Sequence, residues 1–124
     1  MRTMNLFDNL EFHDKDPYAQ PLFVDDAGRV LRFTLRPGQT IMQHNAPDSP
    51  LYIVVLQGHG MFTGADIKAD RFGPNALLVF DRGENHTVQA LDEDLVFVGF
   101  LHGAPDAIPG KLGGVLAQGD QLVP

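Results

Sequence analysis

Two histidines in the middle of the chain are the residues best suited to chemistry. His44 lies in the stretch GQTIMQHNAPDSPLYIVVLQG, and His86 lies in FGPNALLVFDRGENHTVQAL. A neutral imidazole carries one lone pair that binds a metal ion or accepts a hydrogen bond, and its charge changes near neutral pH. A single histidine on an apolar strand is more often an ordinary core residue, but two in similar settings favour a shared site. Both are therefore candidates for binding a metal ion or for orienting a polar ligand.

The spacing around these histidines resembles the two sequence motifs of the cupin superfamily, G-x5-H-x-H-x4-E-x6-G and G-x5-P-x-G-x2-H-x3-N. The first stretch keeps the spacing without a gap from Gly38 to Gly58, and the second keeps it from Asn75 to Ala90. Asn75 replaces a glycine, and asparagine tolerates the left-handed backbone that a turn often needs. The resemblance spans roughly residues 20–104. It implies an all-β fold, the cupin double-stranded β-helix or jelly-roll barrel, in a single domain.

The resemblance also indicates which ligands of the family are missing here. His44 and His86 occupy two of the positions that bind a metal ion in the family. Ala46 replaces the second histidine of the first motif, and Leu51 replaces its glutamate. A divalent ion held by two imidazoles leaves most of its coordination shell to water, which disfavours tight binding of Fe, Mn, Ni or Zn. His102, at the end of LVFVGFLHG, is the candidate for a third ligand.

Strand geometry predicts which side chains line the cavity. Side chains two positions apart on a strand point to the same side, so Met42, His44 and Ala46 are predicted to share one face. The resemblance makes this the inner face of the barrel, and the same alternation directs Leu51 and His86 inward. We expect an apolar cavity that includes Met42, Ala46 and Leu51, in which the two histidines contact a ligand.

The elements that must position these residues are short strands. Apolar segments of four to eight residues alternate with breaks rich in Gly, Pro, Asn and Asp, which is typical of a sandwich or barrel. The segments are PLFV, VLRFTL, TIMQH, LYIVVL, GMFTG, ADRF, ALLVF, HTVQAL and LVFVGFL. They divide the chain into an N-terminal arm, residues 1–20, a barrel, residues 21–104, and an irregular C-terminal tail, residues 105–124.

Two of these segments predict a covered outer face. Residues 51–56 and 95–101 are apolar on both sides, which a half-exposed strand should not be. The cover is either the N-terminal stretch, residues 5–20, or a second subunit, and we expect a homodimer. Arg32 and Arg36 alternate with the apolar residues of VLRFTLR, so we expect them on a solvated face.

The charge of the chain limits its partners. Nine Lys and Arg residues against 16 Asp and Glu residues give a net charge of −7, which repels phosphate backbones and anionic membranes. We therefore expect a small organic ligand and neither nucleic acid nor a membrane as partner. The chain has no cysteine, which excludes disulfides and thiolate metal sites. It shows no secretory signal and no run of about 20 apolar residues, which predicts a cytoplasmic protein.

Three functions fit these observations. The preferred one is a small-molecule-binding cupin with a degraded metal site, in which His44 and His86 are polar anchors in an apolar barrel cavity. The alternative is a metal-dependent cupin enzyme, an oxygenase or isomerase, that uses His44, His86 and His102. A metal-free enzyme in which the two histidines act as general acid and base is the third.

Overall fold

The computed structural model describes residues 1–103 and 114–116, except for the side chains of Gln43 and His44. This part of the chain forms ten strands and no helix, so the prediction of an all-β fold is confirmed. Within it, accordingly, there is no helix with the length and apolar character needed to cross a membrane. The cytoplasmic location stays a prediction.

The strands follow the predicted apolar segments closely. In the first half of the chain they are β1 (Tyr18–Val24), β2 (Gly28–Leu35), β3 (Thr40–His44), β4 (Leu51–Gln57) and β5 (Gly60–Thr63). In the second half they are β6 (Ala69–Phe72), β7 (Leu77–Phe80), β8 (His86–Ala90), β9 (Leu95–His102) and β10 (Gly114–Val115). The short strand β10 departs from prediction, because it lies in the tail expected to be irregular. Residues 104–113 and 117–124 of that region lie outside the described part.

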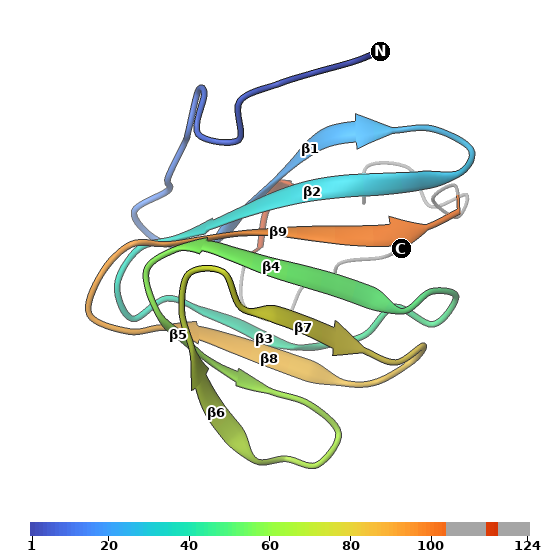
Figure 1. Cartoon of the computed structure of the whole chain (residues 1–124). Helices are drawn as coiled ribbons and strands as arrows, with labels where there is room; N and C mark the ends of the chain where they lie inside the picture. Colours follow the sequence, from blue (N-terminus) through green and yellow to red (C-terminus); the bar gives the residue numbers. More distant parts are fainter. Residues whose placement is uncertain (104–113, 117–124) are drawn as a thin grey trace.

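The strands form two antiparallel sheets that face each other (Figure 1). The larger sheet has the order β10-β1-β2-β9-β4-β7, and the smaller sheet has the order β3-β8-β5-β6. Each sheet contains neighbours that are distant in sequence, such as β2 beside β9, as a jelly roll requires. In Figure 1 the larger sheet is the upper layer and the smaller sheet is the lower one.

Alternate residues of both sheets fill the space between them. On β2 the inner residues are Leu31, Phe33 and Leu35, each at most 1% exposed. Phe33 stacks on Phe97 with ring centroids 4.7 Å apart, and Phe62 of the smaller sheet meets Phe97 edge-on at 5.6 Å. These rings join the two sheets into one core. The predicted inward positions of β4 and β8 are also buried: Leu51, Ile53, Val55, His86, Val88 and Ala90.

Strand β3 departs from the predicted alternation because it contains an irregularity of the β-bulge type. Ile41 pairs with Val88 in the ladder. His44 pairs with His86, so two residues of β3 face a single residue of β8 between these pairs. The extra residue shifts the inner face of the strand, and Ile41 is 4% exposed whereas Met42 is 49% exposed. The prediction that Met42 lines the cavity is therefore wrong.

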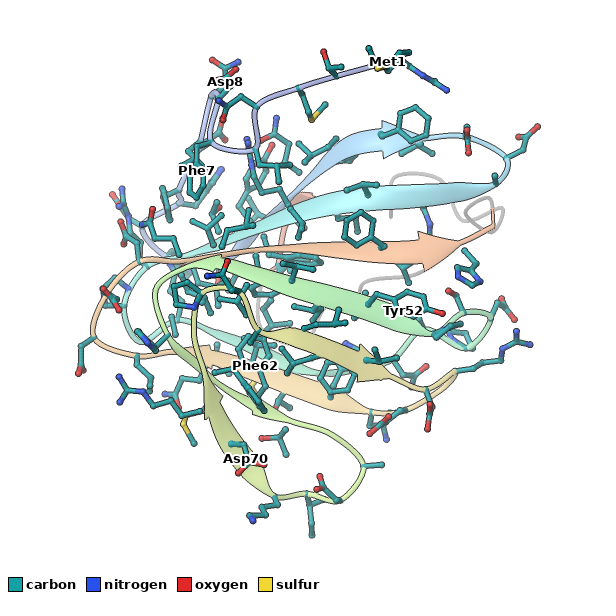
Figure 2. All side chains as sticks on the ribbon, viewed as in Figure 1. Met1, Phe7, Asp8, Tyr52, Phe62 and Asp70 are labelled. Atoms are coloured by element: carbon teal, nitrogen blue, oxygen red, sulfur yellow. The ribbon has the colours of Figure 1, made fainter. Side chains whose placement is uncertain are left out.

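The N-terminal arm covers part of the outer face of the larger sheet. Arg32, on that face of β2, is only 1% exposed. Its guanidinium donates hydrogen bonds to three backbone carbonyls of the arm, those of Leu6, Asp8 and Asn9. Figure 2 labels Asp8 in this arm, above the larger sheet. The arm, one of the two covers considered, thus lies over β2, and whether a second subunit covers the rest of the face stays a prediction. The prediction of a solvated Arg32 is wrong, because arm carbonyls replace water around it.

Candidate functional site

Residues from both sheets meet at one end of the barrel. In the larger sheet, Leu51 pairs with Phe80 on one side and with Leu101 on the other. In the smaller sheet, the backbone of His44 pairs with that of His86. The rings of Phe80 and His86 stack with centroids 4.6 Å apart, which links the two rows across the barrel. The backbone thus brings five separate strands of the sequence to a common place.

His86 is held in one orientation at this end. It is 3% exposed, and its Nδ1 lies 3.1 Å from the backbone carbonyl oxygen of Glu84. Because a carbonyl oxygen only accepts hydrogen bonds, Nδ1 carries a proton, and the lone pair of the neutral ring is on Nε2. The stacked ring of Phe80 restricts the plane of the imidazole. The ring of His86 is therefore held in place from both its face and its Nδ1 edge.

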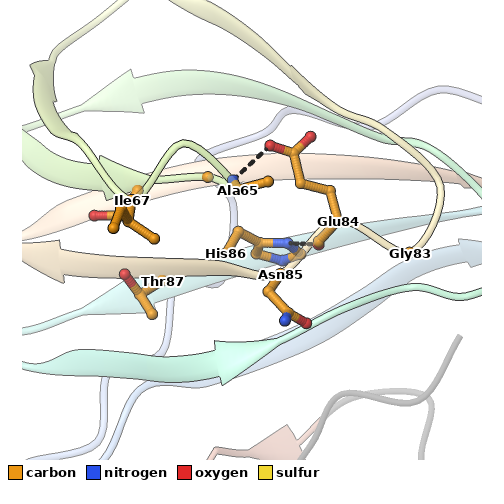
Figure 3. Close-up of a pocket in the computed structure, with 9 residues that line it drawn as sticks. Ala65, Ile67, Gly83, Glu84, Asn85, His86 and Thr87 are labelled. Atoms are coloured by element: carbon orange, nitrogen blue, oxygen red, sulfur yellow. Dashed lines mark hydrogen bonds between the residues drawn. The ribbon is translucent and has the colours of Figure 1, made fainter.

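Glu84 ties together the two loops beside His86. Its carboxylate accepts hydrogen bonds from the backbone N–H of Ala65, in the β5–β6 loop, and of Asp81, in the β7–β8 loop, each at 2.8 Å. The bond from Ala65 and then that from Asp81 lower the pKa of the Glu84 carboxyl below its ordinary value; partial burial opposes this, and His86 adds a smaller lowering. Figure 3 shows Glu84 reaching from its loop to Ala65.

Glu84→Gln is expected to destabilise the fold by about 1–2 kcal/mol at neutral pH, the usual worth of hydrogen bonds to a charged acceptor. Because the folded-state pKa of Glu84 lies below its ordinary value of 4.5, this stability is present above that value and is lost as pH falls through the folded-state pKa. Urea unfolding of both proteins across the acidic range should show a difference that shrinks toward low pH.

Asp70→Asn is the matched control for Glu84→Gln. Asp70 is an exposed carboxylate on β6, so its replacement should change the free energy of unfolding by less than about 0.5 kcal/mol. A loss for Glu84→Gln that is the same at acidic and neutral pH would contradict a role for the ionised carboxylate.

An open groove lies beside His86, between the loops that Glu84 joins. Its volume is about 340 Å³, which is enough for a small molecule. Figure 3 shows its wall, in which Ala65 and Ile67 come from one loop and Glu84, His86 and Thr87 from the other loop and β8. A ligand in this groove would lie between apolar and polar residues, with His86 among those that line it.

The other family ligand positions carry no donor atoms. Ala46 and Leu51 are 7% and 4% exposed and belong to the apolar core. His102 is exposed, and its ring stacks on Tyr52 with centroids 5.5 Å apart. Both rings lie on the outer face of the larger sheet, because the inward residue beside His102 is Leu101. The prediction that His102 enters the cavity as a third metal ligand is therefore wrong.

The donor set does not fit a tightly bound metal ion. Among the residues that the structure describes, no three His, Cys, Asp or Glu groups come together in a way that would hold a metal. His44 and His86 are the imidazoles that remain at family ligand positions, and divalent ions in such sites usually take three or more protein ligands. The side chain of His44 lies outside the described part, so its contact with a ligand or metal stays a prediction.

Arg29 is a buried cation near the same end of the barrel that was not predicted from the sequence. Arg29 is 2% exposed and pairs with the inward residue Leu101. The signal was available, because Arg29 alternates in register with Leu31, Phe33 and Leu35, the inner residues of β2. An arginine at the start of a strand is usually expected to be exposed to solvent. Here the alternation of the inner residues along β2 extends back to position 29 and predicts that Arg29 is buried.

Comparison with known proteins gives structural matches only. No protein-family model matches the chain, and no curated protein matches it. Among solved structures, the chain is similar to an RmlC-like cupin protein from Desulfovibrio desulfuricans, with 26% sequence identity, a TM-score of 0.72, and coverage of 82% of this chain and 96% of that one. This similarity extends over most of both chains.

Two further structures share the fold at lower sequence identity. One is an uncharacterized conserved protein with a double-stranded β-helix domain from Klebsiella pneumoniae, with 15% identity, a TM-score of 0.77, and coverage of 83% of this chain and 85% of that one. The other is a putative mannose-6-phosphate isomerase from Ralstonia eutropha, with 19% identity, a TM-score of 0.70, and coverage of 84% of this chain and all of that one. At these identities the likeness concerns the fold alone.

Proposed function

This chain is a small cupin domain, and we propose that it binds a small organic ligand at the barrel end that carries His44 and His86. The observation that carries the proposal is the buried His86, whose Nδ1 contacts the Glu84 carbonyl and which is among the residues that line an open groove. Mostly apolar sites with a few oriented polar groups are typical of small-molecule binding. The histidines would orient the polar part of the ligand by hydrogen bonding.

The proposed site derives from a metal site that has lost its function. Ala46 and Leu51 keep the positions of two ligands but contribute only apolar surface to the core. A buried leucine in place of a glutamate also removes the negative charge that attracts a cation. The site would therefore hold its ligand through imidazole groups and apolar contacts.

A metal-dependent enzyme is the second candidate. The contact of His86 Nδ1 with a backbone carbonyl is the arrangement that metal-binding histidines commonly have, and one structure with the same fold is a putative isomerase. Such an oxygenase or isomerase would hold Fe, Mn, Ni or Zn with His44 and His86 and would fill the other positions with water. His102 would take no part, because its ring lies on the outer face.

Metal analysis of the untagged full chain separates these candidates. We expect no stoichiometric metal, even after incubation with Fe, Mn, Ni and Zn salts. We expect the double variant Ala46→His with Leu51→Glu to bind zinc or manganese, because it restores the two missing donors at positions that the barrel already holds. Each single variant should bind at least about tenfold more weakly than the double variant.

The function of the site is tested by the same measurements on His44→Ala and His86→Ala. Stoichiometric metal in the unchanged chain that disappears in both variants would overturn the proposal of a degraded site and favour the enzyme. A double variant that folds but binds no more metal than the unchanged chain would show that these four positions do not converge.

We also propose that two copies associate through the uncovered part of the outer face. Leu77, Val79 and Phe100 are 65%, 52% and 40% exposed, although all are large and apolar. Tyr52 and Val54 connect them through the ladders of β4 with β7 and β9. The chain carries a net charge of −7, but none of these five residues is charged. Two copies that meet through this patch would therefore bring no like charges of the patch itself into contact.

Sedimentation at a series of concentrations tests the association. Val79→Asp, on the edge strand β7, is expected to yield monomers, whereas Ile67→Asp, at an exposed site away from this patch, should leave the dimer intact. A chain that stays monomeric at every concentration, or a dimer indifferent to Val79→Asp, would rule this interface out.

A further inference from the structure

A second cavity lies outside the barrel, between the N-terminal arm and the outer face of the larger sheet. Its volume is about 640 Å³, within the range of small-molecule sites. We propose that it binds a small amphipathic carboxylate, whose apolar body lies on the sheet and whose carboxylate is held by Arg2. The cavity shares no lining residue with the groove at His86, so this proposal does not depend on the function proposed there.

The floor of this cavity is a row of apolar side chains across three neighbouring strands. Phe23 of β1 pairs with Val30 of β2, and Val30 pairs with Phe100 of β9. Residues paired across an antiparallel ladder lie on one face, and this is the outer face, because Leu31, next to Val30, belongs to the core. The register of β1 shifts next to Phe23, and Leu22 at this irregularity also lines the cavity. The floor therefore offers a hydrocarbon chain an apolar surface.

The N-terminal arm forms the opposite wall of the cavity and is attached to the sheet at two points. At one point, the guanidinium carbon of Arg2 lies 4.1 Å from the centroid of the Phe23 ring. At the other, the backbone carbonyl of Leu6 accepts a hydrogen bond from Arg32. Residues 3–4, between these points, also line the cavity. Figure 2 shows the arm above the larger sheet. The two attachments hold this wall in place while the residues between them leave room for a ligand.

Arg2 determines the charge of the ligand that fits this cavity. Six of the eight lining residues are apolar, and Arg2 is the one charged residue among them. None of the ion pairs among the described residues involves Arg2. Its contact with the Phe23 ring holds the cation beside the cavity but supplies no anion. The planar fork of N–H donors on a guanidinium matches the two oxygens of a carboxylate, so the site combines an apolar surface with an anion-binding group.

The charge of the whole chain favours a single carboxylate over other anions. The net charge of −7 repels a doubly charged phosphate more strongly than a singly charged group, and it also repels an anionic membrane. The apolar floor adds affinity in proportion to the ligand area that it covers. A free carboxylate with a hydrocarbon body is therefore the occupant that suits both the floor and Arg2.

Titration of the full chain with matched probes tests this proposal. The probes are hexanoate, octanoate and octanamide, below the concentrations at which they form micelles and at constant ionic strength, followed by ¹H–¹⁵N NMR. We expect octanoate to shift the amide signals of Thr3, Val30 and Phe100. It should bind at least about fourfold more tightly than hexanoate, because two more methylenes are buried. It should bind about two- to fivefold more tightly than octanamide, the effect of a partly exposed ion pair.

Variants at position 2 assign the preference for a carboxylate to the arginine. Arg2→Gln should make octanoate and octanamide bind alike, whereas Arg71→Gln, at an exposed arginine on β6, should leave the difference unchanged. Equal binding of octanoate and octanamide to the unchanged chain, or no shift at Val30 and Phe100 with octanoate, would overturn the proposal. Binding of octanoate that Arg2→Gln leaves unchanged would overturn it as well.

The same spectra separate this ligand from other occupants of the cavity. Phe100 also belongs to the patch proposed for the association of two copies, so the titrations are repeated on Val79→Asp, in which we expect the octanoate shifts to persist. Shifts that follow protein concentration but not octanoate, and that disappear in Val79→Asp, would assign the surface to a second copy. Shifts with vesicles of anionic lipid but not with octanoate would assign it to a membrane. Octanoate shifts confined to residues 84–87 would place the ligand in the groove at His86 and would also overturn the proposal.

Discussion

Gly58→Ala is expected to destabilise the fold by about 3 kcal/mol or more. Gly58 follows β4 with a φ of 77°, in the left-handed region that disfavours residues with a Cβ atom. A Cβ atom there would also overlap the backbone carbonyl of Asp94, and it would lie 3.1 Å from the Cα of Leu95. Backbone at the start of β9 cannot rotate away as a side chain would, so the turn itself must deform. Urea unfolding monitored by circular dichroism measures the loss.

Gly38→Ala is the matched control, because it separates the two contributions. Gly38 has a φ of 82°, but a Cβ atom there would meet nothing within 4 Å. Its replacement should therefore cost only the backbone strain, about 1–2 kcal/mol. Similar losses for the two variants would show that the contact with Asp94 does not matter. Gly58 lies at the end of β4 away from Leu51, so ligand binding by folded Gly58→Ala should be unchanged.

Much of the barrel was predictable from the sequence because short strands carry a local signal. An apolar segment bounded by Gly, Pro or Asn can be recognised from adjacent residues alone. Strands β1 to β9 lie at the positions that these segments predict. Asn75 has a φ of 74°, the left-handed conformation expected where the motif has a glycine. Leu51 and His86 point inward because β4 and β8 keep a strict alternation from their first residues.

The errors at the site have a different physical origin, since they depend on contacts between distant strands. Met42 is exposed because the pairing of β3 with β8 slips by one residue, which no property of TIMQH reveals. His102 ends a strand that is apolar on both faces, so alternation could not assign its side. Arg29 and Arg32 are both buried, although they lie on opposite faces of β2. Three of the acceptors of Arg32 are backbone carbonyls. Every residue has such a carbonyl, so the sequence does not indicate which of them will accept a hydrogen bond.

Arg32→Met is expected to lower the free energy of unfolding by about 2–4 kcal/mol, because it removes four hydrogen bonds from a buried guanidinium to part-buried acceptors. The guanidinium donates to the carbonyls of Leu6 and Asp8 at 2.8 and 2.9 Å and to Gln20 Oε1 at 2.6 Å. Methionine keeps the length of the side chain, so the loss reports the hydrogen bonds more than the volume. Arg36→Met is the control, since Arg36 is half-exposed and pairs with Asp94; its loss should stay below about 1 kcal/mol.

A double-mutant cycle shows whether Arg32 acts through the N-terminal arm. Deleting residues 1–10 removes the arm carbonyls that Arg32 binds, so Arg32→Met should have little further effect in the shortened chain. We expect a coupling free energy of at least about 1 kcal/mol from chemical unfolding of the four proteins. Additive losses would mean that Arg32 stabilises the sheet without the arm. Strong coupling would instead mean that the buried cation Arg32 holds the N-terminal arm against the outer face of β2, whereas Arg29 is buried on the opposite face of the same strand.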